Sequence, residues 1–396
     1  MTKVAIYNLG CKVNRVESDS IASSYRARGS ELVALEDADL IVVNTCTVTA
    51  QAEKKTRKAI RGILRTNTHA RVLVTGCAAV INPDFYANLD QRITVVDKTD
   101  LLDEPNSFER VGSAFPTRVG IKVQDGCNHA CTYCIVHIAR GKAWSRSLSA
   151  ITQEVDYLIS CGVKEIVLTG IDLGSYHVVD GSLPVLLKEL LQRDNSVRYR
   201  LSSIEPRSLS DETLRLLATS DGRLCRHLHI PLQSGSSRIL KEMNRPYNAE
   251  YFAALCEKAY DTIEQLSLTT DVIVGFPGEQ EEDFEQTLVL SNYARFSKIH
   301  VFPYSIRQGT PAASRNDHVD PAVKSRRAQI LGELSQTLRT TEAHKRIGTT
   351  EYVLVEQDGL AMSESYYHVA LSQPHPIGSL LPLTMTDYDE TGMFKS

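Results

Sequence analysis

The chain has 396 residues, which is enough for two or three domains, each with its own hydrophobic core. Lys and Arg total 44 against 48 Asp and Glu, and the net charge of −4 excludes the overall basic character that is usual among nucleic-acid-binding proteins. The sequence shows neither a run of 18 apolar residues nor a signal-peptide pattern, so we expect a cytoplasmic protein without a membrane partner.

The first hundred residues alternate short apolar strands with helix-like stretches. We expect strands at 4–9, 40–44, 72–75 and 93–96, and helices at 16–28 and 51–65. Alternation of this kind predicts a parallel sheet covered by helices, in a first domain that spans residues 1–100.

Three cysteines directly follow three of these strands, namely Cys11, Cys46 and Cys77. The carboxyl ends of parallel strands meet at one edge of a sheet, so we expect the three thiols to converge there. The chain has nine cysteines, an odd number without an export signal, and this favours metal or redox use over disulfides. The alternative is three buried cysteines without a function, because cysteine is among the most buried residue types.

Basic side chains crowd the predicted helix at 51–65, and a second basic run lies near residues 324–346. Most such runs are solvated faces, but they are also candidates for contact with nucleic-acid phosphates. The candidates for RNA binding are Lys54, Lys55, Lys58, Arg61 and Arg327.

Residues 98–117 are polar, contain Pro and Gly, and suit a linker. The alternation of strands and helices then resumes over residues 118–315. We expect strands at 119–123, 165–169, 198–202, 227–231, 268–274 and 298–304, and helices near 150–160, 183–193, 210–218, 249–263 and 281–295. Six βα units are too few to close a full TIM barrel, so the sequence predicts an open six-stranded barrel.

Three more cysteines, Cys127, Cys131 and Cys134, follow the first barrel strand with the spacing CxxxCxxC. Thiolates hold iron–sulfur clusters, which usually take four of them, so a set of three suggests a cluster whose fourth iron binds another ligand. A zinc knuckle is the alternative. Structural zinc takes four ligands, however, and neither a fourth Cys nor a suitably spaced His follows the loop, since His129 lies inside it.

The segment from Cys127 to Cys134, with Tyr133 before the last cysteine, resembles the signature of radical S-adenosylmethionine (SAM) enzymes. Over nearly the whole chain, the sequence is similar to the methylthiotransferases that modify transfer RNA. The resemblance implies an α/β protein in which an N-terminal parallel-sheet domain precedes an open (β/α)6 radical SAM barrel. It also implies two 4Fe-4S clusters: one on Cys127, Cys131 and Cys134 that binds SAM, and an auxiliary one on Cys11, Cys46 and Cys77 that carries sulfur.

The resemblance further implies contacts to SAM at the ends of the barrel strands. These contacts are expected from Tyr133, Gly170, Glu205, Gln233, Arg245 and Asp271. Each position taken alone is also compatible with an ordinary turn or a structural polar residue. No catalytic residue is expected beyond the cluster ligands, because the difficult chemistry belongs to the cofactors.

The segments 10–18 and 203–206 resemble the branch of the family that acts on N6-threonylcarbamoyladenosine at tRNA position 37, beside the anticodon. The expected reaction inserts a methylthio group at carbon 2 of that base. Isopentenyladenosine in tRNA and a ribosomal-protein aspartate are alternative substrates, and a non-catalytic iron–sulfur RNA-binding or sensor protein is a more distant alternative. The expected partners of this monomer are the tRNA anticodon stem-loop, an electron donor such as flavodoxin or ferredoxin, and a sulfur source.

The last part of the chain is expected to hold a connecting helix at 316–347 and a small all-β module at 348–396, with strands at 352–356, 365–371 and 380–384. The module resembles the TRAM domain, an RNA-binding β-barrel, and a structural cap is the alternative. Three residues depart from the family pattern, namely Val80, His137 and Trp144. Trp144 stands where relatives usually carry Arg, and our hypothesis is that its ring stacks on a nucleobase.

Overall fold

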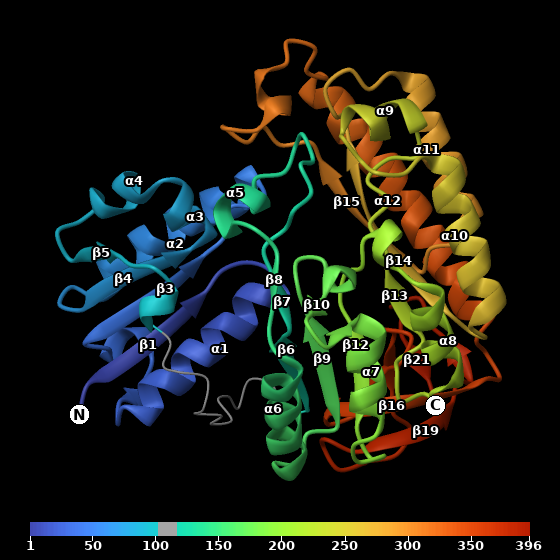
Figure 1. Ribbon diagram of the computed structural model, residues 1–396, viewed down its shortest axis with the longest axis horizontal. Coiled ribbons are helices and arrows are strands. Elements are labelled where there is room, and N and C mark those ends of the chain that lie inside the picture. The colour runs from blue at the N-terminus through green and yellow to red at the C-terminus, as the bar shows by residue number, and fades with distance from the viewer. Residues whose placement is uncertain (102–116) are drawn as a thin grey trace.

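The computed structural model describes residues 1–101 and 117–396, so most of the predicted linker at 98–117 lies outside the described residues. Figure 1 shows an N-terminal α/β unit on one side, a strand-lined barrel with helices on its outside, and a C-terminal group of strands below the barrel. No helix in these two ranges is long and apolar enough to cross a membrane. The domain limits at 1–100, 118–315, 316–347 and 348–396 stay predictions.

The N-terminal sheet has five parallel strands in the order β2-β1-β3-β4-β5. They are β1 (Lys3–Asn8), β2 (Glu31–Leu32), β3 (Leu40–Thr45), β4 (Arg71–Gly76) and β5 (Ile93–Val95). The predicted parallel sheet and its four longer strands are confirmed. The edge strand β2 was not predicted, because two residues are too few to show an alternating pattern.

The helices of this unit are α1 (Lys12–Ala27), α2 (Ala50–Thr66), α3 (Cys77–Ile81) and α4 (Pro83–Ala87). Helix α2 begins where the side chain of Thr49 accepts a hydrogen bond from the backbone N–H of Ala52, which satisfies an otherwise unpaired donor. Apolar side chains from the sheet and the helices, such as Ile41, Ile60 and Val74, are fully buried between them.

The barrel consists of six parallel strands that follow one another in sequence order. They are β6 (Arg118–Lys122), β9 (Glu165–Thr169), β12 (Arg198–Leu201), β13 (His227–His229), β14 (Ser267–Val274) and β15 (Lys298–Pro303). Parallel bridges, such as that from Ser203 to His229, join the sheet β12-β9-β6 to the sheet β13-β14-β15. The predicted open six-stranded barrel is confirmed.

Five long helices cover the outside of the barrel, each close to its predicted range. They are α6 (Leu148–Ser160), α7 (Leu183–Leu191), α8 (Asp211–Thr219), α10 (Ala249–Thr262) and α11 (Glu281–Tyr293). Shorter elements lie in the loops: β7 (Gln124–Asp125) with β8 (Trp144–Ser145), β10 (His177–Val178) with β11 (Gly181–Ser182), α5 (Val136–Arg140) and α9 (Ser237–Glu242).

The long helix α12 (Pro321–His344) connects the barrel to a six-stranded sheet in the order β19-β16-β17-β18-β21-β20. The strands are β16 (Thr350–Gln357), β17 (Leu360–Ser363), β18 (His368–Ala370), β19 (Leu380–Thr384), β20 (Asp387–Tyr388) and β21 (Phe394–Lys395). A strand was expected from residue 365, but β18 begins only at His368. Tyr366 has a φ of 71°, and this left-handed conformation belongs to a turn.

The C-terminal module closes the amino-terminal end of the barrel. Glu165 is fully buried, and its two carboxylate oxygens accept hydrogen bonds of 2.7 Å from the guanidinium groups of Arg198 and Arg200. The same two guanidinium groups donate to four backbone carbonyls of the module, those of Tyr352, Met362, Ser363 and Glu364. The geometry supports the role of a cap; an RNA-binding role for the module stays a prediction.

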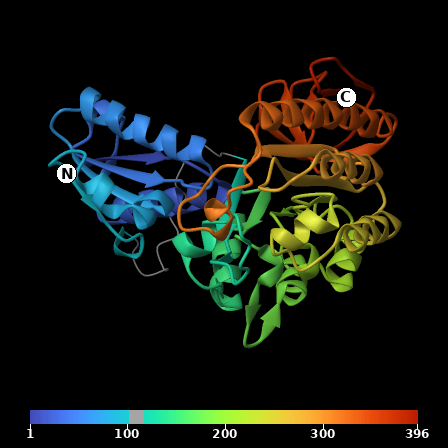
Figure 2. The same ribbon diagram turned by 90° about the horizontal axis from the view of Figure 1, so that it is seen from above.

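The N-terminal unit packs against the barrel beside its first strand. At Gly120 in β6, an added Cβ would lie 2.5 Å from a methyl group of Val16 in α1, so the glycine permits this close approach. On the other side, the Ser305 hydroxyl accepts a 2.9 Å hydrogen bond from the backbone N–H of Ala50, and Arg307 pairs with Glu53 at 2.7 Å. Seen from above in Figure 2, the segment after β15 accordingly runs between the N-terminal unit and the barrel.

Candidate functional site

The CxxxCxxC loop leaves the carboxyl end of β6 and continues into α5. Each of its three sulfurs accepts a hydrogen bond: Cys127 from the backbone N–H of His129 at 3.4 Å, Cys134 from that of Val136 at 3.4 Å, and Cys131 from the Arg245 guanidinium at 3.1 Å. Hydrogen bonds to sulfur stabilise anionic thiolate ligands and tune the potential of a cluster.

Burial raises the pKa of the Cys134 thiol to about 11 and also raises that of Cys127. Buried thiols of this kind stay protonated at neutral pH unless a metal replaces the proton. The donor set therefore fits a metal-bound state.

The number of thiols decides between zinc and an iron–sulfur cluster. Within residues 1–101 and 117–396, the one set of three metal-ligating side chains with all its ligand atoms within 4.8 Å is His229, Asp271 and His300, and neither cysteine set is that compact. Structural zinc takes four ligands, whereas three thiolates suit a cluster whose fourth iron binds another group.

Arg245 and Glu205 form a buried ion pair next to the loop, with Arg245 also bound to Cys131. Burial raises the pKa of Glu205 although Arg245 opposes this. The second carboxylate oxygen, Oε1, is buried and has no hydrogen-bond partner among residues 1–101 and 117–396. An unpaired buried acceptor of this kind fits a donor from a ligand, such as a ribose hydroxyl.

Tyr133 belongs to the same loop, and Gly170 lies against Gln124, just before the loop. The Tyr133 hydroxyl is 3.5 Å from Arg245, and its ring packs edge-on against Phe276 with centroids 6.5 Å apart. An added Cβ at Gly170 would lie 2.8 Å from Oε1 of Gln124, an atom that already accepts backbone N–H groups of Ile171 and Asp172. The glycine is therefore required by its contact with Gln124, whether or not a ligand is bound.

Gln233 has a strained backbone. Its φ of 66° is in the left-handed region, which costs about 1–3 kcal/mol for a residue other than Gly. Its N–H donates to the carbonyl of Asp271 and its carbonyl accepts from the N–H of Ile273, both at 2.9 Å, so β14 holds the strained conformation. Strain that is held in this way is typical of a ligand-binding position.

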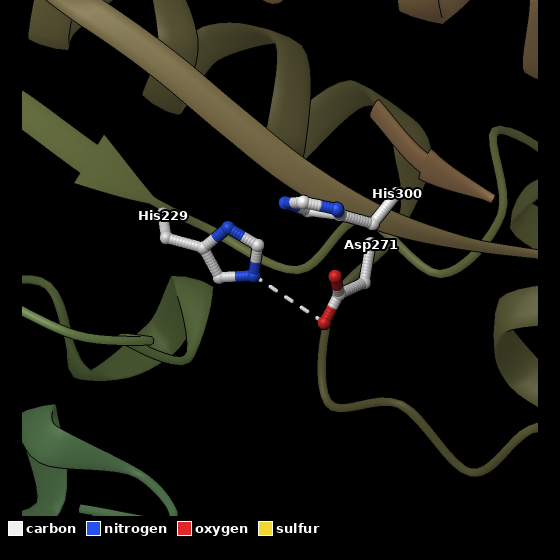
Figure 3. Close-up of side chains that lie close together, drawn as sticks. All are labelled: His229, Asp271 and His300. Carbon is white, nitrogen blue, oxygen red and sulfur yellow. Dashed lines mark ion pairs between the residues drawn. The ribbon is translucent and has the colours of Figure 1, made fainter. Parts of the chain in front are cut away.

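Asp271 is level with Gln233, whose backbone N–H donates to the Asp271 carbonyl at 2.9 Å. Figure 3 shows its carboxylate among the imidazole rings of His229 and His300, with an ion pair to His229. The Nε2–Oδ2 distance of that pair is 3.3 Å, and the two rings are 5.7 Å apart.

The structure brings the three N-terminal cysteines together at the carboxyl edge of their sheet. Cys11 and Cys77 both add to the effect of burial in raising the pKa of Cys46. Gly10 has a φ of 126°, and a Cβ there would come within 2.7 Å of the Cys46 side chain. Gly76, with a φ of 90°, leaves similarly little room beside Asn44. The two glycines shape a cradle around the thiols.

One buried network joins the two cysteine sets. Arg140, six residues after Cys134, donates to Glu17 at 3.0 Å, to Asp125 at 2.9 Å and to Asn14 at 2.6 Å. Burial alone would raise the pKa of Glu17, but Arg140, Lys98 and Lys122 together lower it. Lys122 and Arg140 likewise hold the pKa of Asp125 at about 2 despite burial. The network fixes α1, which follows Cys11, against α5.

Arg140→Met should destabilise this junction. The change leaves two buried carboxylates with fewer cations, and breaking a buried pair costs about 3–5 kcal/mol. We expect a drop of several degrees in thermal unfolding temperature. Arg326→Met, which breaks an exposed pair with Glu281, is the control and should change little. Equal effects of the two changes would contradict the importance of the network.

Sequence reasoning missed this network and the His129–Asp172 pair at 3.3 Å, in which the Asp172 carboxylate accepts a hydrogen bond from His129 and raises its pKa. Arg140, Glu17 and Asp125 are far apart in sequence, and charged residues show no periodic pattern. The one usable signal was their position within a few residues of the cysteines.

The predicted RNA contacts divide into two groups. Lys54, Lys55, Lys58 and Arg61 are all exposed on one face of α2. Arg327 is only 3% exposed and pairs with Glu279 and Glu281, so it does not present a free guanidinium to phosphate. The prediction for Arg327 does not fit this position.

Trp144 is exposed, with the Lys122 ammonium 5.4 Å from its ring. Exposed apolar side chains also follow three of the cysteines at short distances in sequence, namely Val48, Val80 and Ile138. Apolar surface of this kind beside a metal site can be covered by a flat ligand such as a nucleobase.

Comparison with known proteins gives a consistent result. Residues 121–290 match the radical SAM superfamily, and residues 3–97 match a family described as uncharacterized protein family UPF0004. The chain is 40% identical to threonylcarbamoyladenosine tRNA methylthiotransferase MtaB of Bacillus subtilis, over 85% of this chain and 81% of that protein. It is 36% identical to the protein of the same name from Thermotoga maritima, over 90% and 87% of the two chains.

Another relative, tRNA-2-methylthio-N(6)-dimethylallyladenosine synthase of Endomicrobium trichonymphae, is 33% identical over 89% of this chain and 88% of its own. Among solved structures, the radical SAM methyltransferase TsrM of Kitasatospora setae has a TM-score of 0.59 at 15% identity, over 79% of this chain and 77% of that one. The cobalamin-dependent SAM radical enzyme OxsB has a TM-score of 0.52 at 11% identity, over 85% and 56%. At these identities, the structures establish the fold alone.

Proposed function

Because the chain belongs to the radical SAM methylthiotransferase family, we propose that it inserts a methylthio group at carbon 2 of N6-threonylcarbamoyladenosine in tRNA, at position 37 beside the anticodon. As a member of the radical SAM superfamily it is an enzyme that uses SAM and a 4Fe-4S cluster. The proposed substrate rests on the name shared by relatives that are 33–40% identical over most of the chain.

The two cysteine sets support a reaction that needs two metal groups. When bound, SAM and the clusters supply one-electron chemistry and an activated sulfur, because side-chain acids and bases cannot activate an adenine carbon–hydrogen bond. We assign the first cluster to Cys127, Cys131 and Cys134, and the auxiliary cluster to Cys11, Cys46 and Cys77. Arg140 joins the elements that follow both sets, and so keeps them facing a common space.

The surrounding side chains bind and orient. We assign to Glu205 the acceptance of a hydrogen bond from a SAM hydroxyl through its unpartnered Oε1. Arg245 fixes Glu205 and donates to Cys131 at 3.1 Å. Tyr133, Gly170, Gln233 and Asp271 complete the proposed SAM site.

The remaining partners are part of the same proposal. The exposed basic face of α2, with Lys54, Lys55, Lys58 and Arg61, is suited to the phosphates of the anticodon stem-loop. We further propose a cytoplasmic monomer that takes electrons from a flavodoxin or ferredoxin and receives sulfur from a separate source.

Mass spectrometry of tRNA nucleosides from strains with and without the gene tests the proposal. We expect the methylthio form of N6-threonylcarbamoyladenosine to vanish in the deletion strain and to return with the intact gene, while its precursor accumulates. Loss of the methylthio form of isopentenyladenosine instead would assign the other tRNA substrate. Unchanged tRNA with loss of a methylthio-aspartate would assign the protein substrate.

Trp144→Ala should weaken the binding of the anticodon stem-loop. Stacking of a base on an aromatic ring contributes about 1–3 kcal/mol, so we expect an affinity loss of roughly fivefold to a hundredfold in a fluorescence anisotropy titration. Tyr293→Ala is the matched control, because this similarly exposed ring lies on α11 at the outside of the barrel. Equal affinity of wild type and Trp144→Ala would exclude stacking.

A further inference from the structure

His229, Asp271 and His300 lie close together inside the barrel, on three neighbouring strands, and His229 is the last residue of β13. Both nitrogens of His229 have partners, since Nδ1 lies 2.9 Å from the Thr269 hydroxyl and Nε2 lies 3.3 Å from Asp271. His300 differs from its neighbours. Its side chain is exposed and makes no hydrogen bond within residues 1–101 and 117–396. Its ring therefore offers an unused N–H to whatever enters the barrel.

Lys12 reaches the same interior from the N-terminal unit. Its ammonium lies 5.1 Å from the centre of the Tyr366 ring. The Tyr366 ring in turn stacks on His227, whose Nε2 is 3.0 Å from the Thr269 hydroxyl that also contacts His229. The charge of Lys12 also contributes, after burial, to the lowered pKa of His300.

Lys12 is unusual among the cations at this junction because it lacks an acidic partner. Arg118 pairs with Glu356 at 2.7 Å, Arg200 with Glu165 at 2.7 Å and Lys122 with Asp125 at 2.9 Å. In the part of the chain that the structure describes, Lys12 makes no ion pair, and its ammonium, which contacts the Tyr366 ring, has three donors. A fixed cation without a counter-charge favours an anionic ligand.

We propose that Lys12 and His300 form a carboxylate-binding site, which takes the threonyl carboxylate of the modified base. This inference rests on the proposed function and explains its substrate. Lys12 donates to the carboxylate as a cation and His300 donates a neutral N–H, while His229 contacts the Asp271 carboxylate at 3.3 Å. An isopentenyl group carries no charge, so it would leave Lys12 without a partner.

The site lies level with the proposed SAM contacts. The Asp271 carbonyl accepts the backbone N–H of Gln233 at 2.9 Å, and His229 is bridged to Ser203, two residues before Glu205. Asp271 pairs with His300 in the neighbouring strand.

A divalent metal ion on His229, Asp271 and His300 is the competing interpretation, because imidazole and carboxylate groups suit such ions. The satisfied nitrogens of His229 argue against it. The two interpretations differ in their response to a chelator.

The test measures binding of two stem-loops to the reconstituted, oxygen-free holoenzyme. One carries N6-threonylcarbamoyladenosine, and the other carries the same base with its carboxylate converted to a carboxamide. We expect wild type to prefer the carboxylate by roughly tenfold or more, the worth of one charge-assisted hydrogen bond. Lys12→Met and His300→Phe should each remove most of this preference, whereas Lys241→Met, an exposed lysine on α9, should retain it.

Iron content and SAM cleavage are measured for every variant, because Lys12 is next to Cys11. If Lys12→Met loses iron, the conclusion depends only on His300→Phe, a change in β15. A wild type that binds both stem-loops equally, or variants that keep the full preference, would overturn the carboxylate site. Loss of the preference on adding EDTA, with iron retained, would replace it by a metal site. If wild type fails to methylthiolate the first stem-loop at all, the proposed function fails as well.

Discussion

Cys131→Ala is expected to abolish SAM cleavage, whereas Cys46→Ala is expected to retain cleavage and lose only the transfer of sulfur. Cys131 belongs to the loop beside Arg245 and Glu205, where SAM is expected to bind. Cys46 lies in the N-terminal cradle beside Gly10. Removing one of three thiolates should prevent its own cluster from forming and leave the other in place.

The measurement compares iron content, SAM cleavage and methylthio transfer for anaerobically reconstituted proteins. We expect about eight irons per chain in wild type and about four in each variant. Cys256→Ala is the control, because Cys256 is buried in α10 far from both sets in sequence and should leave the iron content unchanged. If Cys131→Ala and Cys46→Ala both keep the wild-type iron content, the two-cluster assignment is wrong.

Glu165→Ala is expected to have the largest effect on stability. It leaves Arg198 and Arg200, both about 1% exposed, without the carboxylate that lies between them. Loss of one partner from a buried ionic network costs about 3–5 kcal/mol, and the same arginines hold the C-terminal module. Thermal unfolding followed by circular dichroism should show a markedly lower midpoint.

The pH dependence of stability tests this role of Glu165. Arg198 and Arg200 overcome the effect of burial and hold the pKa of Glu165 far below its usual 4.5. A depressed carboxyl pKa stabilises the fold above the unfolded value, and this stabilisation is lost as pH falls below about 4.5. Wild type should therefore lose more stability on acidification than Glu165→Gln. Glu212→Gln, at an exposed pair with Lys188, should behave like wild type. A wild type and Glu165→Gln with the same acid profile would contradict the assignment.

Much of the fold follows from local sequence patterns. The six barrel strands and the long helices were predicted within a few residues, because buried parallel strands and amphipathic helices have clear periodicities. The pairs β7–β8 and β10–β11 were missed, since strands of two residues show no pattern. The C-terminal sheet was predicted with three strands instead of six for the same reason.

The site was predictable where chemistry depends on residue type and strand position. From their positions after parallel strands, we predicted that Cys11, Cys46 and Cys77 converge. In the structure, Cys11 and Cys77 lie close enough to Cys46 to raise its pKa. The pairing of Asp271 with His229 was not predicted, because a motif shows which strand a residue is on but not which partner it finds. Arg327 was taken for a surface charge, but its pairing with Glu279 depends on tertiary packing that sequence does not show.

The C-terminal module, which closes the amino-terminal end of the barrel, determines from which direction water can reach the interior. Four carbonyls of the C-terminal module and the carboxylate of Glu165 occupy the donors of two arginines at that end. Solvent must then arrive from the opposite end, where the tRNA base itself would sit. The bound base therefore closes the remaining entrance to the barrel. A reactive intermediate is protected from water only while the correct base is in place.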